Sequence, residues 1–409
     1  MDIKNLSHED ETSLKRRLGN VNNELGVFFM NQATALAQKI GEEEDVDERV
    51  LSSTLCASDE LLRRSKEYLQ EGVQIFKAIN DTANIALLLS NSGRLWRIAG
   101  HIKSQTRATN KHEFGDPEMV EYRKAINEYQ SALQTLGSRR TNPGVWESVT
   151  WELCCTYFTV GTLLQDQAPL SSLSREEAEK QVTENFLKAL KFCELEVSGP
   201  RQIVYQYRAA IIHQRLASLY HHSYRSFPPE DNSFRRKKLR QLSENHYGKA
   251  APLFFQLDRF GDYLRSVLER CGLYEAQAET QTSTGTKYKT YMAVLDALLT
   301  TVPALERMDG EAASSGGDRQ DLVPEAGEET TTEDKQEEAF LVKTLLQRVQ
   351  ATLLALFKAI SSKPVKKGKD VDPNGPKIKS LYAESLKCNE SVGEVLLLLN
   401  KVKSCVSAF

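Results

Sequence analysis

The chain has 409 residues, of which 40% are hydrophobic and 27% charged, and its formal net charge is −3. This balance gives no overall attraction to nucleic acid or to a membrane surface, and it is ordinary for a protein with an apolar core. The sequence opens on a polar stretch and has no uninterrupted apolar run near the roughly 20 residues that a membrane span needs, so we expect no membrane segment.

The first predicted helix covers about residues 12–40, because apolar residues recur there at steps of three and four. They are Leu14, Leu18, Val21, Leu25, Phe28 and Phe29. An acidic loop at 41–48 separates this helix from a second one, whose recurring residues are Tyr68, Gly72, Phe76 and Ile79. The two stripes predict a pair of amphipathic helices joined by a loop.

The second predicted helix pair shows the pattern best. Leu89, Gly93 and Trp96 share a stripe on its first helix, and Ala125, Tyr129 and Ala132 share a stripe on the next. A small residue lets two helices approach closely, and a large ring one turn away fills the space beside it. This combination predicts close packing within the pair.

The same pattern recurs three more times along the chain. The third copy has Trp151, Cys155 and Phe158, then Val182, Phe186 and Ala189, with a capping box from Ser174 to Glu177 at the predicted start of its second helix. The fourth has His213, Leu216, Ala217 and Tyr220, then Ser243, Tyr247 and Ala250. The fifth and weakest has Leu268, Cys271 and Gly272, then Ala293 and Ala297.

Five recurring helix pairs predict an all-α, tetratricopeptide-like right-handed helical solenoid. Its small residues are separated by 67, 62, 62 and 55 positions, against about 34 in a standard repeat, so the helices or their loops are longer here. The residues assigned to repeat packing are Gly26, Gly93, Trp96, Ala125, Tyr129, Trp151, Cys155, Phe186, Ala217, Tyr220, Tyr247 and Gly272.

The composition divides the chain into three parts. Residues 1–308 form the predicted array of about five helix pairs. Residues 309–338 carry eleven acidic residues against Arg319 and Lys335, a local balance of −9, and predict an acidic disordered linker. Residues 339–409 predict a pair of amphipathic helices that fold back as a C-terminal hairpin and cap the array.

No motif for catalysis or cofactor binding appears. Phosphate-binding glycine loops, the nucleophile elbow and the H-E-x-x-H zinc motif are all missing. The step from His213 to His221 is two helical turns, too long for a metal site without other ligands. The seven cysteines include no C-x-x-C pair, which predicts reduced thiols, and small-residue packing explains Cys154 and Cys155. We therefore predict no enzyme, metal, cofactor or small-molecule substrate.

The polar face of the first helices is the predicted binding surface, with other proteins as partners. Its residues are Asn23, Ser90, Arg94, Arg97, Glu152, Gln214, Ser218 and His221. Such a groove suits an extended or helical peptide, with Arg94 and Arg97 as anchors for acidic groups. An ordinary wet surface is the alternative, as is occupation of the groove by the acidic linker. Val27 stands where the carboxylate clamp of chaperone adaptors has an asparagine, so that pattern is not met.

Two basic runs are candidate nuclear import signals. The first consists of Arg235, Arg236, Lys237, Lys238 and Arg240, and the second lies at 363–369. No zinc finger, helix-turn-helix or basic zipper accompanies them, so we expect no direct nucleic-acid binding.

Several stretches of the chain resemble the repeat region of the erythroid differentiation-related factor family. They are Leu14 to Val21, Ala86 to Leu89, Gly93 to Leu95, Trp151 to Leu153, Thr156 to Thr159, Tyr207 to Ala210 and His213 to Tyr220. The resemblance covers most of residues 12–300 and, weakly, the last two helices. It implies tetratricopeptide repeats and a nuclear regulator of erythroid transcription, and it offers no catalytic residues. A cytoplasmic adaptor in chaperone or trafficking complexes, using the same surface, is the alternative.

Overall fold

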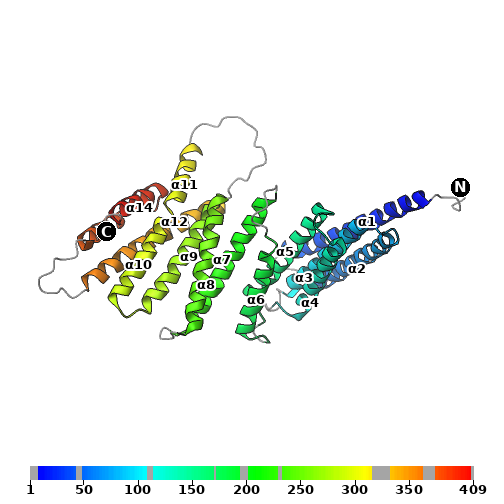
Figure 1. Ribbon diagram of the computed structural model, residues 1–409, viewed down its shortest axis with the longest axis horizontal. Helices are drawn as coiled ribbons and strands as arrows, with labels where there is room; N and C mark the ends of the chain where they lie inside the picture. The colour runs from blue at the N-terminus through cyan, green and yellow to red at the C-terminus, as the bar shows by residue number, and fades with distance from the viewer. Residues whose placement is uncertain are drawn as a thin grey trace. The chain divides into compact units, whose positions relative to one another are not determined.

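The computed structural model describes residues 8–42, 48–107, 114–169, 172–193, 201–228, 233–315, 332–362 and 374–406. These residues form fourteen α-helices and no β-strand (Figure 1). The chain divides into two compact units, Met1–Glu194 and Leu195–Phe409, and this division falls inside the array expected over 1–308.

The first unit contains three helix pairs. The pairs are α1 (His8–Glu42) with α2 (Glu48–Ala78), α3 (Thr82–Arg107) with α4 (Asp116–Leu136), and α5 (Pro143–Gln167) with α6 (Arg175–Leu190). The second helix of each pair also packs against the first helix of the next, as α2 does against α3 and α4 against α5. This is the stacking of a helical-repeat protein, in which each unit contacts its neighbours along the chain.

The second unit is stacked in the same way and contains three further pairs. The helices in chain order are α7 (Gln202–Ser226), α8 (Phe234–Gln256), α9 (Phe260–Glu279), α10 (Thr284–Leu299), α11 (Val302–Ser315), α12 (Thr332–Ser361), α13 (Asn374–Ser385) and α14 (Val392–Val406). α12 packs against α9 and α10 in the way that α9 packs against α7 and α8, and α13 pairs with α12. The predicted all-α, tetratricopeptide-like fold is confirmed, and α12 with α13 forms a sixth pair.

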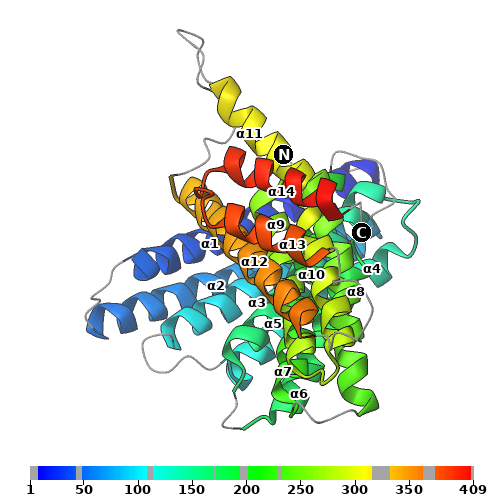
Figure 2. The same ribbon diagram turned by 90° about the vertical axis from the view of Figure 1, so that its left-hand side faces the viewer.

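The C-terminal part differs from the expected hairpin of two helices. The expected last helix is divided into α13 and α14, because Asn389 and Ser391 turn the chain between them. The Asn389 side chain accepts a hydrogen bond from the Ser391 amide at 2.9 Å, and Ser391 caps the start of α14 through the Glu394 amide at 3.4 Å. α14 packs chiefly against α11, and Figure 2 shows these two helices side by side.

The expected acidic linker is helical at both of its ends. Residues 309–315 belong to α11 and residues 332–338 belong to α12. The remainder of that expected segment, 316–331, lies outside the described residues. The segment therefore separates α10 from its next stacking neighbour, α12, without ending the stack.

α12 forms the centre of the second unit's core. Its stretch Gln336–Ser361 is long and apolar enough to cross a membrane by composition alone. Leu345, Val349, Leu353 and Leu356 are buried, however, in one hydrophobic cluster with residues of α9, α10 and α14, whereas Phe340 near the start of the stretch is 65% exposed. Packing within the second unit thus accounts for the buried apolar stripe of this helix.

Glycines mark the closest helix contacts in the first unit. A Cβ atom on Gly93 would lie 2.7 Å from the ring of Tyr129, and one on Gly26 would lie 2.7 Å from Leu69. Both distances are shorter than real contacts allow, so only glycine permits these approaches. Ala125 is fully buried on the same face of α4 as Tyr129, and Trp96 lies half-buried one turn beyond Gly93.

The third pair makes its closest contact at a different residue from the one expected. A Cβ atom on Gly161 would meet the fully buried ring of Phe186 at 2.8 Å, whereas Cys155 is half-buried, as is Trp151. Cys154 is the cysteine that faces α6, with its Sγ 3.4 Å from the carbonyl oxygen of Ala189. The sequence pattern placed the contact on the correct helix, α5. It chose Cys155 over Gly161 because α5 has a small residue at both positions.

The fourth and fifth pairs rely less on glycine. The hydroxyl of Ser243 donates to the carbonyl oxygen of Ala217 at 2.9 Å, as Ser65 donates to Gly26 at 2.7 Å in the first pair. Tyr247 is buried and Tyr220 half-buried. A Cβ on Gly272 would meet Arg348 only at 3.4 Å, an ordinary contact, so Gly272 is not needed for close approach.

Gly93→Ala tests the close-approach argument. We expect it to lower the free energy of unfolding by about 1–3 kcal/mol, because the Tyr129 ring is buried and has no room to move. The matched control is Gly248→Ala in the middle of α8, where an added Cβ would have no atom within 4 Å, and it should raise stability by about 0.5–1 kcal/mol. Urea unfolding of both variants measures this, and equal effects would contradict it.

Candidate functional site

The polar surface predicted for binding lies on the first helix of each pair, here called the A helices. They are α1, α3 and α5 in the first unit and α7, α9 and α12 in the second. Five of the eight expected groove residues belong to the first unit and three to the second. The structure therefore presents two polar sets, each built on the A helices of its own unit.

An ion pair links two A helices in the first unit. The Arg97 guanidinium on α3 lies 2.7 Å from the Glu152 carboxylate on α5, and both side chains are about one-quarter exposed (25% and 26%). Burial acts to lower the pKa of Arg97, but the nearby Tyr129 and Glu152 outweigh it, so the pKa is raised. Arg97 is held inside the protein and is less available to a ligand than its sequence position indicates.

Arg94 of α3 is the other cation among the expected groove residues. It is half-buried one turn before Arg97, and no ion pair to it occurs among the residues that the structure describes. Next to it Ser90 is buried, and Asn23 accepts a hydrogen bond from the amide of Asn91 at 2.7 Å. Of the two expected anchors, Arg94 is thus the better placed to bind an acidic group.

The A-helix surface of the second unit is a network of polar side chains. On α7, Gln214 is half-buried and Ser218 exposed, and His221 lies beside the phenol oxygen of Tyr247 with an Nδ1 distance of 3.4 Å. Burial, with the nearby Arg225 and Arg348, lowers the pKa of His221 to about 4, so this imidazole is neutral at physiological pH.

Three members of this network were missed by sequence reasoning. The Tyr247 hydroxyl donates to Glu269 on α9 at 3.0 Å, and Arg348 on α12 pairs with Glu275 at 2.9 Å. Burial raises the pKa of both glutamates. The sequence did hold a signal for Glu269. It follows Tyr247 by 22 residues, as Glu152 follows Tyr129 by 23, and the Tyr129 hydroxyl faces Glu152 at 3.5 Å. Arg348 carried no such signal, since α12 was not recognised as an A helix.

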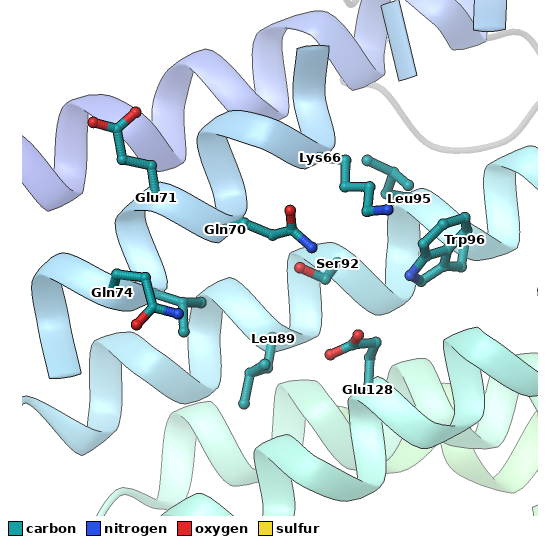
Figure 3. A pocket seen from close by; sticks show the side chains of 10 residues that line it. Lys66, Gln70, Glu71, Gln74, Leu89, Ser92, Leu95, Trp96 and Glu128 are labelled. Carbon is teal, nitrogen blue, oxygen red and sulfur yellow. The ribbon is translucent and has the colours of Figure 1, made fainter. Parts of the chain in front are cut away.

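A cleft of about 460 Å³ lies between α2, α3 and α4 (Figure 3). It is lined by Lys66, Gln70, Glu71, Val73, Gln74, Leu89, Ser92, Leu95, Trp96 and Glu128. The ammonium groups of Lys66 and Lys124 lie 5.3 and 4.4 Å from the centre of the Trp96 ring, close enough for cation–π attraction. Burial raises the pKa of the Glu128 carboxyl at the rim.

The described residues hold neither a cluster of metal ligands nor a disulfide. Among them no three His, Cys, Asp or Glu side chains gather as a metal site, and the seven cysteines are free thiols. The close approach of two sulfurs, 3.6 Å between Cys154 and Cys193, is buried in the packing of α5 against α6. The arrangement offers polar surfaces for binding on the A helices of each unit.

The first basic run lies in the first turns of α8. Arg236 is buried over the Tyr224 ring, Arg235 lies over the Phe227 ring, and Arg240 pairs with Glu244 at 3.2 Å. The other two members, Lys237 and Lys238, are exposed. The second run, 363–369, lies outside the described residues.

Comparison with known proteins matches the chain to one family over almost its whole length. The family described as Erythroid differentiation-related factor 1-like, TPR repeats, matches residues 14–408. The proteins named Erythroid differentiation-related factor 1 from Homo sapiens and Pongo abelii are each 36% identical over 97% of the chain, and that from Mus musculus is 35% identical over 99%. The chain spans 32% of the length of these relatives.

A pair of histidines, of which His213 is buried and His246 half-buried, joins α7 to α8 in the second unit. The Nδ1 atoms of His213 and His246 are 2.8 Å apart, so one imidazole donates its proton to the other. Burial is the main cause that lowers the pKa of each to about 4, and the Lys249 ammonium adds to it. Two protonated rings would each present a donor, and the hydrogen bond would be lost.

The histidine pair predicts a loss of stability in mild acid. The folded pKa of about 4 lies below the ordinary 6.5, so the unfolded chain binds more protons between these values. The stability present above pH 6.5 should fall by about 1–2 kcal/mol by pH 5 through His213 alone. His213→Gln should remove that part of the slope in urea unfolding at pH 5 and 7.5, and an unchanged slope would contradict it.

Proposed function

The chain belongs to the erythroid differentiation-related factor 1-like family of tetratricopeptide-repeat proteins, and on this premise we propose that it is a non-enzymatic scaffold that docks acidic peptides or helices of partner proteins on its A helices. Stacked helix pairs of this kind serve as extended surfaces for protein interaction. The proposed partners are proteins involved in transcriptional control during erythroid differentiation.

One observation carries the choice of an acidic ligand. Arg94 keeps a charge that no carboxylate among the described residues neutralises, while its neighbour Arg97 is paired with Glu152. The Arg97–Glu152 pair links α3 to α5, and Arg94 lies half-buried one turn before it on α3. A guanidinium binds carboxylates in a bidentate manner, so Arg94 suits an acidic ligand.

Arg94→Glu should weaken binding of acidic peptides without unfolding the protein. We expect a loss of about tenfold or more in fluorescence polarisation with aspartate- and glutamate-rich peptides, because one attractive charge becomes repulsive. Arg123→Glu makes the same charge change at an exposed position of α4 and should leave binding unchanged. Equal loss in both variants would show a response to net charge alone and would remove the docking site from α3.

We propose that the protein acts in the nucleus, with the exposed pair Lys237 and Lys238 contributing to import. Their neighbours Arg235, Arg236 and Arg240 are occupied by contacts within the second unit. Lys237 and Lys238 are exposed, so an import receptor would reach them without unwinding α8; Arg235 is exposed as well but lies over the Phe227 ring.

Lys237→Ala combined with Lys238→Ala should shift a fluorescently tagged chain from the nucleus toward the cytoplasm. The control is Lys287→Ala with Lys289→Ala on α10, which removes the same charge elsewhere in the unit. A tagged chain that is cytoplasmic without any substitution would favour the adaptor alternative over the nuclear proposal.

A further inference from the structure

The first helix carries an apolar stripe that is not buried. Leu14, Leu18, Val21 and Phe28 are 57%, 49%, 53% and 53% exposed, and Leu25 between them is half-buried. The sequence predicts that this stripe is the apolar, buried face of the helix. In the structure, α1 packs against α2 through a different face. That other face consists of Gly19, Asn22, Gly26, Met30, Ala33 and Ala37.

The equivalent stripe on the next A helix shows what this face is shaped to receive. Counted from the close-contact glycines Gly26 and Gly93, Leu18, Val21 and Phe28 of α1 correspond to Ile85, Leu88 and Leu95 of α3. All three residues of α3 are buried. They belong to one hydrophobic cluster with Leu69, Val73 and Phe76 of α2. In this protein the stripe is therefore the face of an A helix on which another helix packs.

The spacing of the α1 stripe fits packing against a helix over two heptads. Its residues are separated by four, three, four and three positions, the alternation of a coiled-coil seam. Large exposed apolar residues elsewhere in the described chain, such as Leu187 and Leu397, do not form such a row. A contiguous apolar row of this length on a surface indicates an interface.

The charged residues beside the stripe can pair with the same residues of a second copy. Arg17 and Glu24 are both exposed and flank the same edge of the seam, on either side of Val21. Neither forms an ion pair among the described residues. In an antiparallel pairing of α1 with a second α1, the like edge positions of the two helices face each other, so each Arg17 meets Glu24 of the other copy. The same register stacks Leu14 on Leu25 and Leu18 on Val21.

We infer that α1 is a self-association surface on which a second copy of this chain packs, stripe to stripe and antiparallel. The contact is isologous, because the same residues of both copies form it and each salt bridge occurs twice. It is independent of the peptide-docking proposal, since the stripe lies on a different face of α1 from Asn23, which contacts α3.

Sedimentation velocity across a concentration series of the full chain tests the inference. The wild-type chain should show a monomer–dimer equilibrium, and Leu18→Glu combined with Val21→Glu should abolish the dimer while the circular dichroism spectrum is unchanged. Leu397→Glu, at a 71% exposed position of α14, is the matched control and should still dimerise. A wild-type chain that is monomeric at every concentration overturns the inference and leaves the stripe to a helix of another protein.

Charge reversal tests the antiparallel register. Arg17→Glu and Glu24→Arg should each weaken self-association roughly tenfold, because two attractive pairs become repulsive in each homodimer. An equimolar mixture of the two variants should form a heterodimer, and the double variant with both changes should recover the dimer. Equal association of all forms, or a mixture no stronger than its parts, overturns the register.

Discussion

The first unit depends on bringing the two helices of each of its pairs closer than ordinary side chains permit. Gly26, Gly93 and Gly161 each stand where a Cβ atom would lie 2.7 or 2.8 Å from a buried side chain of the partner helix. Such contacts allow ridge-into-groove packing at short interaxial distance and exclude water from the seam. Within each unit, the second helix of a pair then presents the surface on which the next A helix packs, as α2 does for α3 and α8 does for α9.

The polar surface follows from this stacking. Tyrosines that fill the space between helices turn their hydroxyls toward glutamates of the next A helix, as Tyr129 and Tyr247 do toward Glu152 and Glu269. Buried hydroxyls and carboxylates cost free energy unless they are paired, which explains why these positions are linked. Packing thus decides which charges are neutralised inside the repeat and which, like Arg94, remain for a ligand.

The stacking of helix pairs is interrupted in the sequence between α10 and α12, and one apolar stacking face, on α1, is exposed. The segment between α10 and α12 interrupts the order of helix pairs in the sequence, yet α12 still packs on α9 and α10, because its apolar stripe fits the surface that they present. At α1 the equivalent stripe is exposed. A helical repeat buries its apolar surface only through neighbours, and an exposed stacking face is therefore a place for association.

The sequence by itself determined the helical periodicity, the pairing of helices and the alternation of small and aromatic residues at Gly93 and Tyr129, because these features are local in the chain. It did not decide that α12 is an A helix, that Gly161 replaces Cys155 at the third contact, or that Glu152 neutralises Arg97. It also left open whether the stripe on α1 is core or surface. Periodicity says which face of a helix is apolar, but only the tertiary structure says what lies against that face.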